Sequence, residues 1–339
     1  DEQLYCEAMT DNAYTKQPND ATQNIGNGSY STADPYVKKV WDGRYTGIRM
    51  CNELLENIDR VPDLDPELKK RYIGEAKVLR AYNYYELYTK FGDVPYTTKV
   101  LSIKESMSIA RTAKATVIAN VLADLDEVIN GNYLPTSYDA DNKGRITRWA
   151  AMAIKAKIYL FEGNWTQVKN ITSTIMTEGG FKLFGSYAGL FEIANEYNSE
   201  VILDAQYRPT SREHQMMYVF LPPTLGGYSQ LSPLQELVDS YIMLDGKTIK
   251  ETGTSFDESH PYANRDPRLK ATVMYTGNSY TLADGTEVVI NCEKGEGKDG
   301  YGVGSDCSAT GYYIKKYWDN TYRATLYSGL NPILIRYAD

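Results

Sequence analysis

The sequence is poor in the residues that most chemistry at protein sites requires. Among its 339 residues there are 2 histidines and 4 cysteines, and the cysteines form no CxxC pair. So few imidazoles and unpaired thiols disfavour a metal site built on histidine or cysteine. A catalytic triad would need His214 or His260, and no GxSxG nucleophile motif accompanies either residue. The composition therefore predicts no metal and no other cofactor, and it leaves an enzymatic function without support.

The sequence also lacks clusters of basic residues and long apolar runs. The net charge is −8 and lysine and arginine do not cluster, so we expect no nucleic-acid partner. No run approaches the roughly eighteen consecutive apolar residues of a membrane-spanning helix. The chain begins at Asp1 with neither an initiator Met nor an apolar signal region. We therefore expect an N-terminus that was processed or trimmed.

Tyrosine, by contrast, is abundant. There are 30 tyrosines against 7 phenylalanines and 4 tryptophans. A tyrosine ring can be covered while its hydroxyl stays in water, so this aromatic tolerates partial exposure. Most of the rings are expected in the interior or half-buried, but so many leave a surplus for a surface.

A long helix is predicted over residues 66–91. Asp65 is a side-chain cap, the proline after it has no N–H to leave unpaired in the first turn, and Gly92 supplies a left-handed stop. The aromatic rings within the helix recur at i, i+3, i+4 and i+7, which is the spacing of a packing face. We interpret this aromatic cluster as core. Lys77 and Arg80 share that face, so we expect them to reach carboxylates or carbonyls of a neighbour.

Helical periodicity extends over residues 36–180. Apolar spacing predicts helices at 36–58, 115–129 and 147–163, and a Gly-Asn turn leads into one more. Small residues opposite large ones, with tight turns, are how tetratricopeptide-type hairpins stack. The sequence therefore predicts a mainly α fold on a degenerate tetratricopeptide-like helix-hairpin scaffold.

The pattern changes after residue 180. Short strand-like runs alternate with Pro- and Gly-rich loops, notably LPPTLGGYSQLSP at 221–233, and one helix is predicted at 234–244. We predict an irregular loop-rich face with short β-hairpins over 181–332, where ligand contacts are expected. Cys292 and Cys307 bracket a flexible loop that could accommodate a disulfide, so bridged and free thiols both remain open.

Several segments, in order along the chain, resemble one family. GEAKVLRAYNYYELYTKFGDVPY is similar to the signature of the SusD/RagB family, surface glycan-binding lipoproteins of nutrient uptake in Bacteroidetes. YTGIRMCNELLENI, KGRITRWAAMAIKAKIYLFEGNW, SPLQELVDSYIMLDGK and NPILIRYAD resemble further blocks of the same family. The resemblance implies a single SusD-like domain over 1–339, in which residues 333–339 begin a truncated C-terminal helical repeat.

The resemblance also implies a function. The protein is expected to capture an oligosaccharide or polysaccharide at the cell surface without covalent chemistry. It would deliver that ligand to a SusC-like TonB-dependent transporter of the outer membrane. A lipid anchor, outside this chain, would provide its membrane contact. A peptide-binding lid protein of the RagB type is the alternative, and a glycan hydrolase is the third hypothesis.

Candidate ligand contacts are the aromatic residues of the loops. Sugar rings stack on aromatic planes, and their hydroxyls bond to polar side chains. For each ring the alternative role is that of a partly buried loop anchor, and Trp41 has the helical spacing of a core residue. The predicted ligand-binding residues, of which the first two are preferred, are Tyr30, Tyr228, Asn27, Tyr36, Trp41, Arg212, Trp318 and Tyr322.

Overall fold

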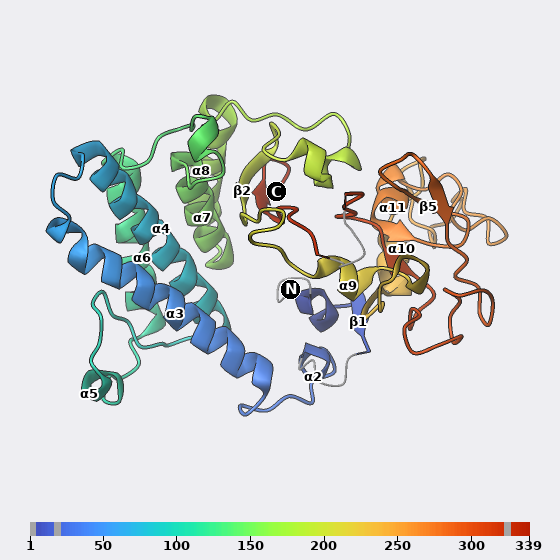
Figure 1. The fold of residues 1–339 in the computed structure, drawn as a ribbon, viewed down its shortest axis with the longest axis horizontal. Helices are drawn as coiled ribbons and strands as arrows, with labels where there is room; N and C mark the ends of the chain where they lie inside the picture. The colour runs from blue at the N-terminus through green and yellow to red at the C-terminus, as the bar shows by residue number, and fades with distance from the viewer. Residues whose placement is uncertain (1–4, 17–21, 322–326) are drawn as a thin grey trace. The chain divides into compact units, whose positions relative to one another are not determined.

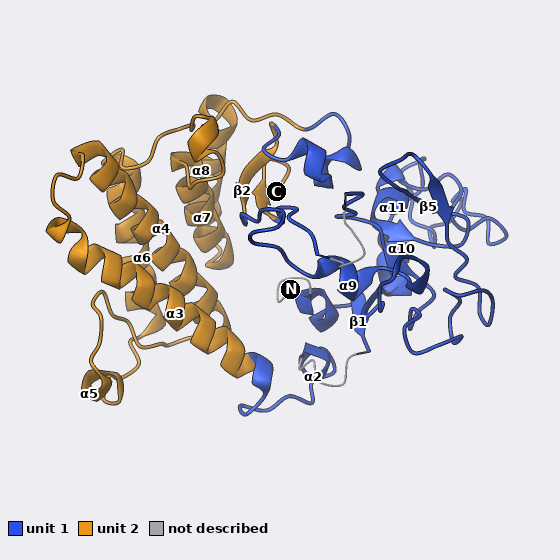
Figure 2. Ribbon diagram, viewed as in Figure 1, with its two compact units in different colours: residues 1–36, 184–198, 205–332 blue, residues 37–183, 199–204, 333–339 orange. Residues whose placement is uncertain are grey.

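A computed structural model describes residues 5–16, 22–321 and 327–339 of the chain (Figure 1). The chain divides into two compact units, coloured separately in Figure 2. Unit 1 comprises residues 1–36, 184–198 and 205–332, and unit 2 comprises residues 37–183, 199–204 and 333–339. Across the described ranges, no helix combines the length and the apolar composition that crossing a membrane requires.

Unit 2 is built from the predicted helices. The helix that begins at Pro35 belongs to this unit from Val37 onward. The elements are α3 (Pro35–Asn57), α4 (Pro66–Phe91), α5 (Ile103–Ser106), α6 (Lys114–Asn130), α7 (Arg148–Phe161) and α8 (Trp165–Glu178), with the 3-10 turns η2 (Ile58–Arg60) and η3 (Ala140–Asn142). α4 packs on α6, α6 on α7 and α7 on α8. The predicted mainly α, helix-hairpin architecture is confirmed.

α3 and α4 pack antiparallel, as helices joined by a short loop do. The ring centroids of Trp41 and Phe91 lie 5.1 Å apart at one end of the pair. At the other end Lys69 Nζ lies 2.7 Å from Asp59 Oδ1. Because Asp59 lies in η2, directly after the end of α3, the two contacts show that the helices run in opposite directions.

The bounds of α4 follow from its capping residues. Asp65 Oδ1 accepts a hydrogen bond from the backbone N–H of Leu68 at 2.8 Å, and Gly92 takes a φ of 69°. Tyr84 and Tyr88 are buried in the main hydrophobic core of the unit. Fully burying one large apolar side chain contributes roughly 1.5–3 kcal/mol. The aromatic cluster of this helix is therefore core, as predicted.

The two basic residues on the same face of α4 also behave as predicted. Arg80 donates to Asp124 Oδ2 at 2.7 Å and to Asn52 Oδ1 at 2.9 Å, so its buried guanidinium is paired. Lys77 forms an ion pair with Glu127. Both cations thus join α4 to neighbouring helices through charged hydrogen bonds.

Within the described residues the strands form four two-stranded antiparallel pairs. β5 (Ser279–Thr281) and β6 (Glu287–Val289) make a hairpin of the kind predicted. The other pairs join distant segments: β1 (Ala13–Thr15) with β3 (Leu231–Pro233), β4 (Val273–Met274) with β7 (Tyr313–Ile314), and β2 (Val201–Asp204) with β8 (Ile333–Arg336).

β8 differs from the helical repeat expected to begin at residue 333. Its register pairs Asp204 with Ile333 and Leu203 with Ile335. Ile335 is buried in the helical core of unit 2. The segment therefore adopts the extended form that its β-branched isoleucines favour, because β2 offers it a partner edge.

Unit 1 contains short elements held by small hydrophobic clusters. Its helices are α2 (Thr22–Gly26), α9 (Met216–Phe220), α10 (Gln235–Ser240) and α11 (Pro267–Thr272), with 3-10 turns η1 (Cys6–Met9), η4 (Gly189–Phe191), η5 (Ile193–Asn195) and η6 (Pro223–Leu225). The helix predicted at 234–244 is thus shorter than expected. Cys292 and Cys307 are both buried free thiols, so the disulfide considered from the sequence is not formed.

Candidate ligand-binding surface

The pair of rings formed by Tyr218 and Tyr228 is the first feature of the candidate surface. Their centroids lie 4.2 Å apart with planes inclined by 34°. The side chain of Tyr228 is 38% exposed, whereas Tyr218 is half-buried. A partly exposed ring that rests on a second ring has a fixed orientation, which suits it to stack against a sugar.

The loop between the two tyrosines explains how they meet. Gly226 takes a φ of 83°, and a Cβ on Gly227 would lie 2.2 Å from the carbonyl oxygen of Leu221. The two glycines therefore let the chain turn back closely on α9. The N–H of Tyr228 then donates to the carbonyl oxygen of Tyr218 at 3.0 Å.

The N-terminal segment packs beside this pair. The hydroxyl of Tyr5 donates to Gln230 Oε1 at 2.6 Å, and Tyr5 and Tyr218 pack against the same apolar cluster of η1, β1, α9 and β3. Tyr14, on β1, is 37% exposed, and its hydroxyl accepts a hydrogen bond from Gln23 Nε2 at 2.9 Å. These contacts connect three tyrosines through the N-terminal segment.

Two of the predicted residues, Asn27 and Tyr30, follow the end of α2, which packs on η1. A Cβ on Gly26 would lie 2.6 Å from the carbonyl oxygen of Ala8, so α2 packs directly on η1. Asn27 Oδ1 accepts from the N–H of Ser29 at 3.0 Å and orders the turn that follows. The side chain of Tyr30, next in the chain, is 54% exposed. Tyr30 is therefore an accessible ring that follows an ordered turn.

Tyr36 approaches η1 from the start of α3. Its hydroxyl lies 3.1 Å from the Sγ of Cys6, and its N–H donates to Asp34 Oδ1 at 3.1 Å. The ring is half-buried. We use the term N-terminal tyrosine surface for six tyrosines on the segments of unit 1 that lead to or from η1 and its neighbours: Tyr5, Tyr14, Tyr30, Tyr36, Tyr218 and Tyr228.

Two of the other predicted residues have anchoring contacts. Trp41 belongs to unit 2, where it packs on the helical core with its ring centroid 4.9 Å from that of Tyr45. Trp318 Nε1 donates to the carbonyl oxygen of Thr281 at 2.8 Å, and its ring lies 5.0 Å from Tyr280. Both contacts fit the alternative role of a structural anchor, and a ligand role for either residue stays a prediction.

The last two predicted residues are a cation and a tyrosine. The guanidinium of Arg212 lies 5.7 Å from the centroid of Tyr207, whose ring meets the edge of His214. Burial lowers the pKa of His214 below its usual value, so this imidazole is neutral at pH 7. Tyr322 lies outside the described residues.

The sequence missed Tyr5, Tyr14 and Tyr218 as members of the surface. Tyr14 occupies a strand of three residues and Tyr218 a helix of five, lengths too short for a periodicity argument. The Gly-Gly turn at 226–227 was the available signal, because it returns Tyr228 to α9.

Two further features of unit 1 and unit 2 bear on metal and pocket sites. Within residues 5–16, 22–321 and 327–339, no group of three or more His, Cys, Asp or Glu side chains is placed to hold a metal ion. A hollow of about 180 Å³ in unit 1 is lined by Tyr262 and Tyr275, but these rings stack on each other with centroids 3.8 Å apart. Ligand pockets usually measure about 300–1,000 Å³, so this hollow is small for a saccharide.

Comparison with known proteins decides the family. Residues 1–160 match the family described as "Starch-binding associating with outer membrane", and residues 189–339 match the "SusD family". The chain belongs to the SusD/RagB family. The resemblance inferred from the sequence is thereby confirmed.

Three similar proteins differ in sequence identity to this SusD family chain and in the share of each chain that is covered. SusD-like protein P25 of Formosa agariphila is 32% identical over 196 residues, which cover 55% of this chain and 37% of that protein. A SusD-like carbohydrate binding protein from Bacteroides fragilis has a TM-score of 0.88 at 26% identity, over 99% of this chain and 65% of the other. A laminarin binding SusD-like protein shares the fold with a TM-score of 0.72 at 22% identity, over 99% and 72%. The chain thus spans less than two thirds of the length of P25 and of the B. fragilis protein.

Proposed function

We propose that this SusD family chain binds an oligosaccharide or polysaccharide on the N-terminal tyrosine surface, without breaking a covalent bond. One observation carries the proposal. Among the described tyrosines, those with exposed fractions of 37–54% all lie in unit 1, and three of them belong to this surface. The similarity to a solved SusD-like carbohydrate binding protein supports the ligand class.

The chemistry of the surface suits a sugar. The C–H faces of a pyranose pack against aromatic rings, and tyrosine keeps its hydroxyl available for a hydrogen bond. Asn27 and Gln230 add amide groups beside Tyr30 and Tyr228, and amides can both donate and accept hydrogen bonds to sugar hydroxyls. Such a set binds a saccharide through contacts alone.

We further propose that binding takes place at the outer membrane and supplies a SusC-like TonB-dependent transporter. The description of the family that matches residues 1–160, which places it with the outer membrane, supports this location. The lipid anchor would lie outside this chain. Copurification of the transporter with the full-length protein from outer-membrane fractions tests the partnership, and its absence from such fractions would argue against it.

Calorimetric titration with a panel of soluble glycans tests the binding site. Tyr228→Ala should weaken binding of any glycan that the wild type recognises by about tenfold, or ~1.4 kcal/mol. Tyr301→Ala is the matched control, because Tyr301 is also a unit 1 tyrosine, 41% exposed, and lies outside the tyrosine surface. Equal effects of the two substitutions would reject the assigned surface.

Two experimental outcomes would assign a different function to the chain. If peptides bind while no carbohydrate does, the chain is a peptide-binding protein of the RagB type. If the recovered glycan is shorter after incubation, the protein is a hydrolase. The proposal expects carbohydrate binding and a glycan of unchanged length.

A further inference from the structure

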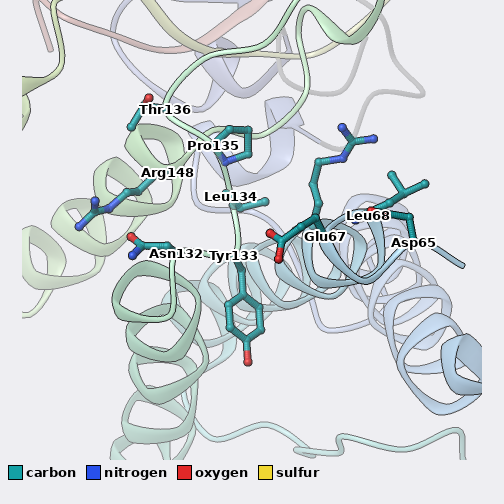
Figure 3. A pocket seen from close by; sticks show the side chains of 10 residues that line it. Asp65, Glu67, Leu68, Asn132, Tyr133, Leu134, Pro135, Thr136 and Arg148 are labelled. Carbon is teal, nitrogen blue, oxygen red and sulfur yellow. Dashed lines mark hydrogen bonds between the residues drawn. The ribbon is translucent and has the colours of Figure 1, made fainter.

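A larger cavity is lined by residues of unit 2, none of which belongs to the tyrosine surface. Its volume is about 530 Å³, within the usual range of ligand pockets. It forms where the first turn of α4, the segment 132–136 that follows α6, and the start of α7 meet. Figure 3 shows Asn132 and Arg148 on one side of this hollow and Glu67 on the α4 side.

The wall of the cavity is well fixed. Leu134 is buried in the main core, and the N–H of Arg148 donates to the carbonyl oxygen of Pro135 at 2.9 Å. A Cβ on Gly74 would lie 2.8 Å from the Cβ of Tyr133, so the segment packs closely on α4. The cavity is therefore preformed by core packing rather than by a loose loop.

Two arginines line this cavity without an acceptor. Among the described residues, no hydrogen bond or ion pair involves the guanidinium of Arg71 or of Arg148, and the Nε of each is buried and unpartnered. The guanidinium of Arg71 lies 5.5 and 5.7 Å from the ring centroids of Tyr72 and Tyr138. By comparison Arg145, close in sequence to Arg148, donates to Glu75 Oε1 at 2.8 Å. Buried arginine groups normally have such acceptors.

The acidic groups nearby do not satisfy these arginines. Asp65 caps α4 by accepting from the N–H of Leu68 at 2.8 Å. Hydrogen bonds from Asn142, with a smaller contribution from Arg71, lower the pKa of Asp139, so that carboxylate is already engaged. Glu67 is the other carboxylate of the lining, and no hydrogen bond or ion pair joins it to either arginine in the described residues. The lining is thus formally neutral, but neither guanidinium has a carboxylate hydrogen-bonded to it.

We propose that this cavity is a second ligand site, which takes a saccharide unit bearing a carboxylate, of the hexuronate class. The ligand carboxylate would accept hydrogen bonds from Arg71 and Arg148, a geometry for which guanidinium groups are suited. Glu67, Asn132 and Thr136 would bond to the sugar hydroxyls. The saccharide part of this assignment rests on the proposed function, whereas the anionic part rests on the two arginines.

Titrations with D-glucuronate, D-glucose and acetate at low ionic strength, followed by NMR of the whole chain, test the site. We expect glucuronate to bind at least about tenfold more tightly than glucose or acetate, and Arg148→Gln to weaken it by about tenfold or more. Arg49→Gln, on the exposed side of α3, removes the same charge elsewhere and should change nothing. Raising salt from about 20 to about 150 mM should weaken glucuronate binding.

Each contrary result has a definite meaning. Absence of glucuronate binding, or binding that Arg148→Gln leaves unchanged, overturns the site. Equal binding of acetate overturns its saccharide part, and equal binding of glucose overturns its anionic part. If Arg148→Gln does not fold, Arg71→Gln provides the same test. Tyr228→Ala should leave this binding intact, so failure of the tyrosine surface and failure of this cavity are distinguishable.

Discussion

The two units use the same residue type in different ways. In unit 2, Tyr45 donates to the carbonyl oxygen of Pro95 at 2.8 Å and Tyr84 to that of Thr97 at 2.9 Å. In unit 1, Tyr30 and Tyr228 are partly exposed at turns. Long helices bury their aromatic faces against one another, whereas short segments between turns lack a neighbour to cover every ring. The difference shows that context, rather than tyrosine content, decides which rings are available to a ligand.

The largest expected effect concerns the buried charge of unit 2. Arg80→Ala removes the closer of the two cations that pair with Asp124 and should lower the free energy of unfolding by about 3–5 kcal/mol, as measured by urea denaturation. Lys38→Ala breaks an exposed ion pair with Asp42 and should cost less than about 1 kcal/mol. Similar losses for the two variants would show that the buried pair has no special role in the helical unit.

A smaller effect should separate the tyrosines of the two units. Tyr84→Phe removes a hydroxyl that donates to the carbonyl oxygen of Thr97 and accepts from its N–H. The substitution should lower the free energy of unfolding by about 1–3 kcal/mol, because the carbonyl and the N–H of Thr97 both lose a partner. Tyr228→Phe should change stability by less than about 0.5 kcal/mol, as is usual for an exposed position. Thermal unfolding of both variants checks the contrast, which equal shifts would contradict.

The smallest effect is expected at the exposed helix α5. Hydrogen bonds from Lys99 and Ser102 lower the pKa of Glu105 from about 4.5 to about 2. Because the pKa falls on folding, the stabilising contribution of Glu105 is complete above its ordinary pKa and disappears as the pH falls through about 2. An NMR titration of the Glu105 carboxyl group should report the low value. A titration near pH 4.5 would show that this contact does not persist in solution.

The sequence predicted unit 2 far better than unit 1. Asp65 and Gly92 set the ends of α4 through local capping, which a sequence displays directly. The surface around η1 depends on contacts such as Tyr5 with Gln230, which are 225 positions apart. No local pattern encodes such a pair. Tyr30 and Tyr228 were predicted as loop aromatics, but the packing of Tyr228 on Tyr218 was not.

The register of β2 with β8 has a consequence for how this architecture can vary. Asp204 and Ile333, which flank the segment 205–332, are direct partners in that ladder. The segment 205–332 therefore begins and ends at neighbouring positions of the β2–β8 ladder. Insertions, deletions or a wholesale exchange within it need not alter the spacing of those ends. A chimera that grafts the corresponding segment of another relative between the two strands should keep the helical scaffold and acquire new recognition properties.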